Sequence, residues 1–90
     1  MKYRKFPNVE SAMAGDRAAI YHTSAKTAVT LNPTATLLWN ALESPRTSSD
    51  LVDDLRKKFP MLSAETAQKD VDAFLKDMVR HELLIAGDGL

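Results

Sequence analysis

The sequence contains no cysteine and only three glycines among its 90 residues. Without cysteine, the chain forms no disulfide and supplies neither a thiolate nucleophile nor a cysteine ligand for zinc or an iron–sulfur cluster. The glycines, Gly15, Gly87 and Gly89, are too scattered to form a phosphate-binding loop. These absences favour a reducing compartment and predict a protein without cofactors.

Long apolar runs and net charge are also missing. No run approaches the roughly 20 apolar residues of a membrane-spanning helix, and the basic N-terminal segment lacks a following apolar signal core. We therefore expect a cytoplasmic protein that does not contact the membrane. Twelve basic residues balance twelve acidic ones, and the acidic residues predominate after residue 26. This balance disfavours nucleic-acid binding, because affinity for phosphate comes from Lys and Arg.

The composition that is present, with 44% hydrophobic and 27% charged residues, is typical of an ordered globular protein. A chain of this size has room for one core, so we expect one domain over residues 1–90. Alternating patterns predict three antiparallel strands at 9–13, 17–22 and 27–31, joined by turns at 15–16 and 24–26. In the second strand, Ala18 and Ile20 are expected to face inward.

Within the segment from Leu31 to Leu42, the spacing of the apolar residues changes from that of a strand to that of a helix. Asn32 is a good N-cap and Pro33 suits the first helical position. One helical face then carries Ala35, Leu38, Trp39 and Leu42. We call this segment (31–42) the joint, and we expect it to hold the third strand in place without touching a ligand itself.

Two more helices are predicted after Pro45. Thr47 and Asp50 form a capping box for a helix over 48–59, and Ser63 caps a third helix that extends to about His81. The expected inward faces consist of Leu51, Val52, Leu55 and Phe59 in the second helix and of Ala67, Val71, Phe74, Leu75 and Met78 in the third. Residues 83–85 form an apolar segment that follows the third helix and precedes a glycine-containing tail. The predicted fold is α+β and winged helix-turn-helix-like, with an N-terminal three-stranded antiparallel sheet followed by three α-helices.

Candidate catalytic residues are few. His22 and His81 lack the spacing of a helical metal site, and the acidic residues at 50, 53 and 54 suit the N-terminal turns of a helix. Asp70, Asp77 and His81 share one side of the third helix, so a metal site or proton relay there stays open as the weaker alternative to a solvated face. The pattern favours a protein that is not an enzyme.

The third predicted strand, 27–31, leaves one sheet edge without a strand partner. Such an edge pairs with an extended peptide, and a neighbouring helix would complete a groove. Two alternatives remain: the basic N-terminal segment covers the edge, or a second copy of the chain does so in a homodimer. Trp39 and Phe74 are expected in the core, with ligand contact as the alternative.

Several motifs together resemble the PqqD-like family. They are the run from Val29 to Trp39, the helix start Arg46-Thr47 with Asp50-Leu51-Val52, the run 70–75 (Asp-Val-Asp-Ala-Phe-Leu), and Leu83-Leu84-Ile85. The resemblance implies a peptide chaperone that binds the leader of a ribosomally made precursor peptide by strand addition. The chaperone would present this leader to a modifying enzyme, often a radical SAM protein. The implied peptide-binding residues are Thr27, Ala28, Val29, Thr30 and Leu31 on the strand and Asp70, Ala73, Phe74, Asp77, Met78 and His81 on the third helix.

Two departures from the family pattern stand out. Ser24-Ala25-Lys26-Thr27 occupies the place of a Pro-Glu-Gly segment associated with pyrroloquinoline quinone (PQQ) biosynthesis, which argues against that pathway. Glu82 replaces a usual glycine, so either a left-handed helix cap is kept there at a cost of about 1 kcal/mol, or the helix simply runs on. A winged-helix DNA-binding regulator and a structural dimerisation module remain the alternative functions.

Overall fold

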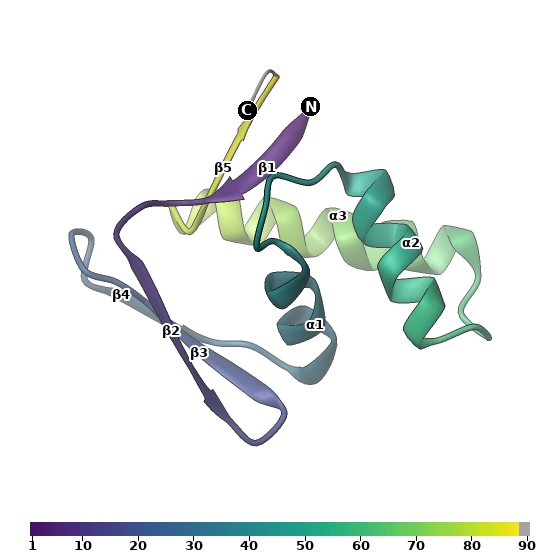
Figure 1. The fold of residues 1–90 in the computed structure, drawn as a ribbon, viewed down its shortest axis with the longest axis horizontal. Coiled ribbons are helices and arrows are strands. Elements are labelled where there is room, and N and C mark those ends of the chain that lie inside the picture. Colours follow the sequence, from purple (N-terminus) through teal and green to yellow (C-terminus); the bar gives the residue numbers. More distant parts are fainter. Residues whose placement is uncertain (89–90) are drawn as a thin grey trace.

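The computed structural model describes residues 1–88, in which five strands and three helices follow one another (Figure 1). The elements are β1 (Lys2–Lys5), β2 (Val9–Ala14), β3 (Arg17–His22), β4 (Thr27–Thr30), α1 (Pro33–Ala41), α2 (Ser48–Lys58), α3 (Ala64–Arg80) and β5 (Leu84–Gly87). This order confirms the predicted α+β fold, in which a three-stranded sheet precedes three helices. The expected tail includes Gly89 and Leu90, which lie outside the described residues.

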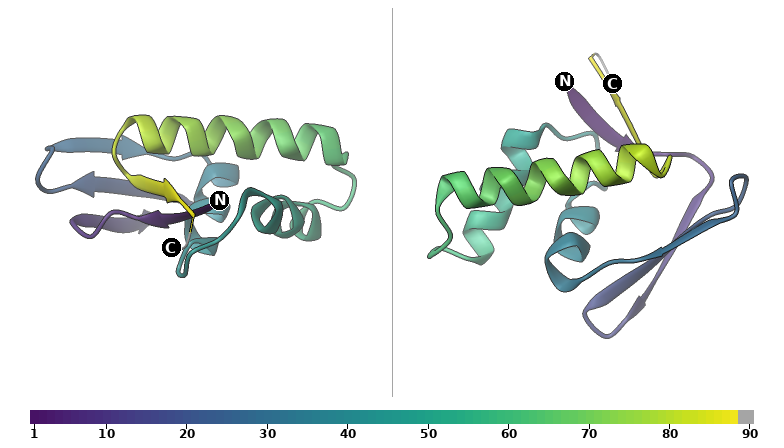
Figure 2. Two further views of the ribbon diagram at one scale, coloured as in Figure 1. Left: turned by 90° about the horizontal axis from the view of Figure 1, so that it is seen from above. Right: turned by 180° about the vertical axis from the view of Figure 1, so that it is seen from behind.

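The three-stranded sheet has the order β2-β3-β4, with β3 in the centre. Both strand pairs are antiparallel, and the register places Ala12 opposite Ala19 and Ile20 opposite Val29. Ala18 and Ile20 are buried, as predicted from the alternation in β3. Of the three strands, β4 lies on the side of α3, which crosses the molecule as a long rod (Figure 2).

The three helices begin at the predicted caps. Asn32 Oδ1 accepts the Ala35 amide at 2.8 Å, and Ser63 caps α3 in the same way. Thr47 and Asp50 exchange two hydrogen bonds in a complete capping box. Side-chain oxygens at these positions satisfy amides that the first helical turn leaves unpaired, so each helix starts where its cap stands. Within residues 1–88, no helix is long and apolar enough to span a membrane.

The joint is attached to β3 by two hydrogen bonds, both of them to Ala18. The Leu31 amide donates to the Ala18 carbonyl at 2.8 Å, and the Ala18 amide donates to Thr36 Oγ1 of α1 at 2.9 Å. Thr36 Oγ1 thus accepts the hydrogen bond that a backbone carbonyl would accept if β4 were longer. These two bonds fix the angle between β4 and α1, because Ala18 is buried and cannot exchange its partners for water.

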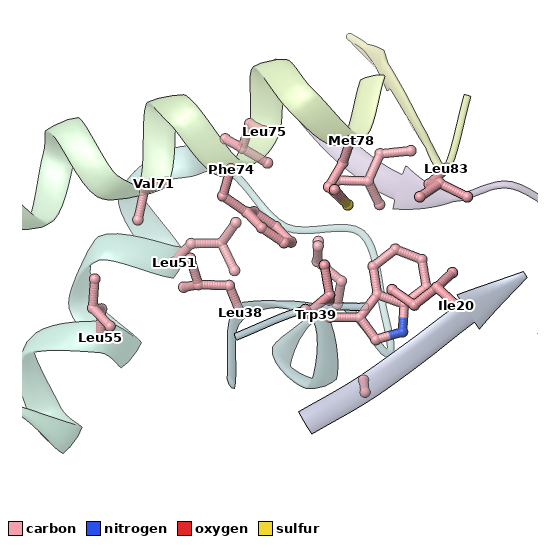
Figure 3. Close-up of a cluster of buried hydrophobic side chains, with 14 of the residues drawn as sticks. Ile20, Leu38, Trp39, Leu51, Leu55, Val71, Phe74, Leu75, Met78 and Leu83 are labelled. Atoms are coloured by element: carbon pink, nitrogen blue, oxygen red, sulfur yellow. The ribbon is translucent and has the colours of Figure 1, made fainter. Parts of the chain in front are cut away.

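One hydrophobic core joins the sheet to the helices (Figure 3). Trp39 of α1 lies near Ile20 of β3, while Phe74 and Met78 point down from α3 toward them. Trp39 is 1% exposed and Phe74 is 7% exposed. Both aromatic side chains therefore belong to the core, as the helical spacing predicts.

A second, two-stranded sheet was not predicted from the sequence. It pairs β1 with β5 in antiparallel register, and Tyr3 also exchanges backbone hydrogen bonds with Arg46. Lys5 Nζ lies 4.6 Å from the centre of the Trp39 ring, and burial lowers the pKa of Lys5, partly opposed by the charge of Glu43. The N-terminal segment therefore covers the core and not the edge of β4, which excludes that alternative.

The C-terminal end of α3 keeps a left-handed residue at Glu82, whose φ is 59°. The Glu82 amide donates to the Val79 carbonyl at 3.0 Å and the Leu83 amide donates to the Met78 carbonyl at 2.9 Å. This pair of bonds is the Schellman motif. The helix therefore stops here and does not run on, and the chain turns back into β5 without a glycine.

The prediction that Phe59 faces the core was wrong. Its side chain is 42% exposed, whereas Leu51, Val52 and Leu55 are buried. The cause is local, because α2 ends at Lys58 and Phe59 adopts φ −125° and ψ 79°. Helical spacing no longer applies to a residue that has left the helix.

Candidate functional site

The outer edge of β4 has no strand partner within residues 1–88. Antiparallel strands alternate between residues that bond to the neighbouring strand and residues that point away from it. Because the Leu31 amide bonds to β3, Thr27, Val29 and Leu31 form the inward-bonding set. The amides and carbonyls of Ala28 and Thr30 consequently point to the open edge, where they can bond to an added strand.

A groove with a volume of about 440 Å³ lies between this edge and α3. Its floor is apolar, since Leu31, Leu38, Phe74 and Met78 are all buried. The full lining consists of Val29, Thr30 and Leu31 at the end of β4, of Asn32, Thr34, Ala35 and Leu38 from α1 and its cap, and of Asp70, Ala73, Phe74, Asp77, Met78 and His81 from α3 and its end. The groove thus has main-chain donors on one wall and a helix face on the other.

The spacing of its residues explains why α3 forms this wall. Positions 70, 73, 74, 77, 78 and 81 recur at intervals of three or four, so they share one side of the helix. Phe74 and Met78 lie at the centre of this side and reach into the core. Asp70, Ala73 and Asp77 flank them and remain exposed.

The fixed charges of the groove lining are negative. Asp70 and Asp77 are carboxylates, and no Lys or Arg is among the lining residues. Asp77 Oδ1 accepts a hydrogen bond from Arg80 Nη2 at 3.2 Å, on an exposed part of the helix. In the described part of the chain, Asp70 makes no ion pair. The groove therefore suits a ligand that combines apolar side chains with a positive charge.

Nine of the eleven predicted site residues line this groove: Val29, Thr30, Leu31, Asp70, Ala73, Phe74, Asp77, Met78 and His81. Thr27 and Ala28 lie at the start of β4 and are not among the lining residues. The structure thus brings the two predicted segments together on facing walls. The role of these residues in binding stays a prediction.

The contribution of α1 to the groove was not predicted from the sequence. Asn32, Thr34, Ala35 and Leu38 belong to the joint, which was expected to touch no ligand, yet all four line the groove. The order of the elements in the chain could have predicted this contribution. A helix that starts two residues after an edge strand must place its first turn at the end of that edge.

The alternative of a metal site or proton relay on α3 finds no support. Asp70 and Asp77 are seven residues apart, which corresponds to about 10 Å along a helix axis, too far for one ion. No group of three or more potential metal ligands occurs in the part of the chain that the structure describes. His22 is buried, and its Nδ1 accepts the Ala25 amide at 3.1 Å, so it holds the turn between β3 and β4.

A family model described as coenzyme PQQ synthesis protein D (PqqD) matches residues 17–84. No curated protein matches the sequence significantly. Among solved structures, the chain is similar to TbiB1 in complex with the TbiA(beta) leader peptide, with a TM-score of 0.83, 23% identity, and coverage of 97% of this chain and 96% of that chain.

A second similar structure is lasso peptide synthetase B1 complexed with the leader peptide. Its TM-score is 0.81 at 16% identity, and the match covers 96% of this chain and 100% of that chain. At these identities the two structures establish the fold. The match covers almost the whole of each chain, so β1 and β5 are part of the shared fold.

Proposed function

This chain belongs to the PqqD family, and from that premise we propose that it binds the leader of a ribosomally made precursor peptide and presents it to a modifying enzyme. The observation that carries the proposal is the open edge of β4 beside the groove. The two similar solved structures support it, since both were determined with a leader peptide.

The leader would bind as an additional strand. Ala28 and Thr30 each offer one amide and one carbonyl, so an extended peptide can form four main-chain hydrogen bonds to the edge. Successive side chains of that peptide point to opposite sides. Alternate residues would therefore enter the groove toward Phe74 and Met78, and the residues between them would face solvent.

The expected affinity follows from these contacts. Each main-chain hydrogen bond contributes about 0.5–1.5 kcal/mol net, and each buried apolar side chain contributes about 1.5–3 kcal/mol. The loss of translational and conformational freedom opposes them with several kcal/mol. A dissociation constant between about 10 nM and a few µM is therefore expected, which allows the peptide to be handed on.

The proposed role is binding, not catalysis. In such a pathway the chemistry would belong to the modifying enzyme, for which the family resemblance suggests a radical SAM protein. The ionisable side chains of the groove, Asp70, Asp77 and His81, are spread along three turns of α3 and its end, so they do not converge on one reacting atom.

The alternative of a DNA-binding regulator conflicts with the charge of α3. The helix has Lys69, Lys76 and Arg80 against Glu65, Asp70, Asp72 and Asp77. A net negative helix would be repelled by the phosphates that flank the major groove.

Calorimetric titration with synthetic leaders of the short reading frames encoded beside this chain's gene tests the proposal. One leader should bind with 1:1 stoichiometry and a dissociation constant in the range above. A peptide of the same composition in shuffled order should bind at least tenfold more weakly. Absence of binding to every such leader, or equal binding of the shuffled peptide, would contradict the proposal. Light scattering would show whether the chain is a dimer whose contact competes with the peptide.

A further inference from the structure

A second pocket opens beyond the end of β4. Its volume is about 390 Å³, and it is lined by Leu55 and Phe59 from α2 and its end, by Met61 and Leu62 from the following loop, and by Thr34 and Asp70. We call it the end pocket. It is the place where the exposed Phe59 side chain lies, which the helical pattern had assigned to the core.

The end pocket continues the groove. Thr34 and Asp70 line both cavities, so the two meet at the first turn of α1 and the N-terminal half of α3. In Figures 1 and 2, the loop between α2 and α3 lies at the far end of α3 from β5, while the β3–β4 turn lies near the β5 end. An extended chain that pairs with β4 and continues past Leu31 would therefore run toward the end pocket.

The apolar lining of this pocket is only partly core: Leu55 is buried, whereas Phe59 is 42% exposed. Met61 is 98% exposed, although its neighbours are held in place. The Leu62 amide donates to the Phe59 carbonyl at 3.0 Å, and Arg56 Nε donates to the Leu62 carbonyl at 3.3 Å. The loop is thus a fixed turn that places two exposed apolar side chains, Phe59 and Met61, in the lining of one pocket. A contiguous exposed apolar patch is a feature of binding surfaces.

Asp70 marks the boundary between the groove and the end pocket. Other acidic side chains of α3 have partners: Glu65 lies 3.7 Å from Lys69 Nζ, and Asp77 bonds to Arg80. Asp70 has none within residues 1–88. It lies four residues before Phe74, or about 6 Å along the helix, which corresponds to about two residues of an extended chain. Residues two apart in a strand face the same side.

On the basis of the function proposed above, we propose that the bound leader continues past β4 into the end pocket. It carries a Lys or Arg opposite Asp70, two residues from the apolar side chain that enters the groove at Phe74. A large apolar side chain beyond this basic residue fills the end pocket against Met61 and Phe59. The recognised ligand is therefore an extended peptide with an apolar, then a basic, then an apolar anchor, and it is longer than the strand that pairs with β4.

Selection from an mRNA-display library of random 14-residue peptides tests this specificity on the full chain. The wild type should enrich peptides with a basic residue two positions from one apolar residue, and with a second apolar residue beyond it. Selection against Met61→Ser should lose the enrichment for the second apolar residue, and selection against Asp70→Asn should lose that for the basic residue. The controls Met13→Ser, on β2, and Asp53→Asn, on α2, alter side chains outside both cavities and should reproduce the wild-type pattern.

Affinity measurements on one selected peptide make the test quantitative. Met61→Ser should raise its dissociation constant about tenfold, since the contact buries part of a large apolar side chain. Asp70→Asn should raise it about fivefold and reduce its dependence on salt. Phe59→Ser gives a second measure of the end pocket, and thermal unfolding checks that each variant is folded.

Two results would overturn the proposal in distinguishable ways. If selected peptides perturb the amides of Ala28 and Thr30 but bind the three variants as tightly as the wild type, the end pocket has no role and the strand-addition function stands. If no peptide is enriched, or if enriched peptides leave Ala28 and Thr30 unperturbed, the strand-addition function and the end-pocket inference both fail.

Discussion

Replacing Thr30 by proline tests whether the edge of β4 receives the peptide. Thr30 lines the groove, and its amide points away from β3 toward the open edge. Proline has no amide proton, and its ring occupies the position from which that proton would be donated. Thr30→Pro therefore removes one of the four edge groups and obstructs the approach of a strand, while the hydrogen bonds between β3 and β4 remain.

The magnitude follows from these two effects. Loss of one main-chain hydrogen bond weakens binding by about 0.5–1.5 kcal/mol, and displacement of the incoming strand by the ring strains at least one further bond. A total of about 1–3 kcal/mol corresponds to a 5- to 150-fold rise in the dissociation constant. Folding should be little affected, because proline is tolerated on edge strands when its missing amide faces outward.

Ser11→Pro provides the matched control. The register of β2 with β3 places the amides of Val9, Ser11 and Met13 on the other open edge of the same sheet. Proline at Ser11 makes the same chemical change on a strand that does not line the groove. Calorimetry on both variants should show weaker peptide binding only for Thr30→Pro. If a folded Thr30→Pro variant binds as tightly as the wild type, or if both variants lose affinity equally, strand addition to β4 is the wrong mechanism.

Two further predictions concern stability. Glu82→Gly should raise the free energy of unfolding by about 0.5–1 kcal/mol in urea titrations, because Glu82 occupies a left-handed conformation that glycine adopts without strain; a decrease would argue against the left-handed cap. Hydrogen bonds from Thr47, aided by the nearby Arg46 charge, hold the pKa of Asp50 below its ordinary value. A lowered pKa stabilises the fold above pH 4 and loses this effect as the pH falls through the folded-state pKa. The stability advantage of the wild type over Asp50→Ala should therefore shrink on acidification, whereas a constant difference from pH 7 to pH 2.5 would contradict this assignment.

The parts of the fold that the sequence predicts are those encoded by neighbouring residues. The caps at Asn32, Thr47 and Ser63 bond to amides three residues away, so their effect is visible in a short window. The inward face of β3 follows in the same way from its alternation. The bond between Thr36 and Ala18, which fixes the joint, could not be predicted because it depends on where β3 lies in space.

The pairing of β1 with β5 is the clearest example of a contact that the sequence does not predict. The sequence of β1 is typical of a solvated basic segment, because it contains Lys2, Arg4 and Lys5. Its pairing joins residues about 80 positions apart, and its contact with the core includes Lys5 lying over Trp39. Neither contact leaves a local pattern in the sequence.

The candidate site likewise has one part that was predicted from the sequence and one part that was not. The facing walls of the groove were predicted from the open edge, the periodicity of α3 and the family resemblance. The end pocket was not, because Phe59 fits the helical pattern of α2 and departs from it only through the backbone angles at the helix end. An exposed apolar residue at the end of a helix is recognised as part of a pocket only after the loop that follows it has been placed.

Amide hydrogen exchange at the edge of β4 tests the central claim most directly. In the free protein, no strand among residues 1–88 pairs with the amides of Ala28 and Thr30, so both should exchange rapidly. When a bound leader peptide saturates the protein, both should become protected, while Ser11 and Met13 on the opposite edge should continue to exchange as before. Protection of neither Ala28 nor Thr30 at saturation, or equal protection of both edges, would contradict the account.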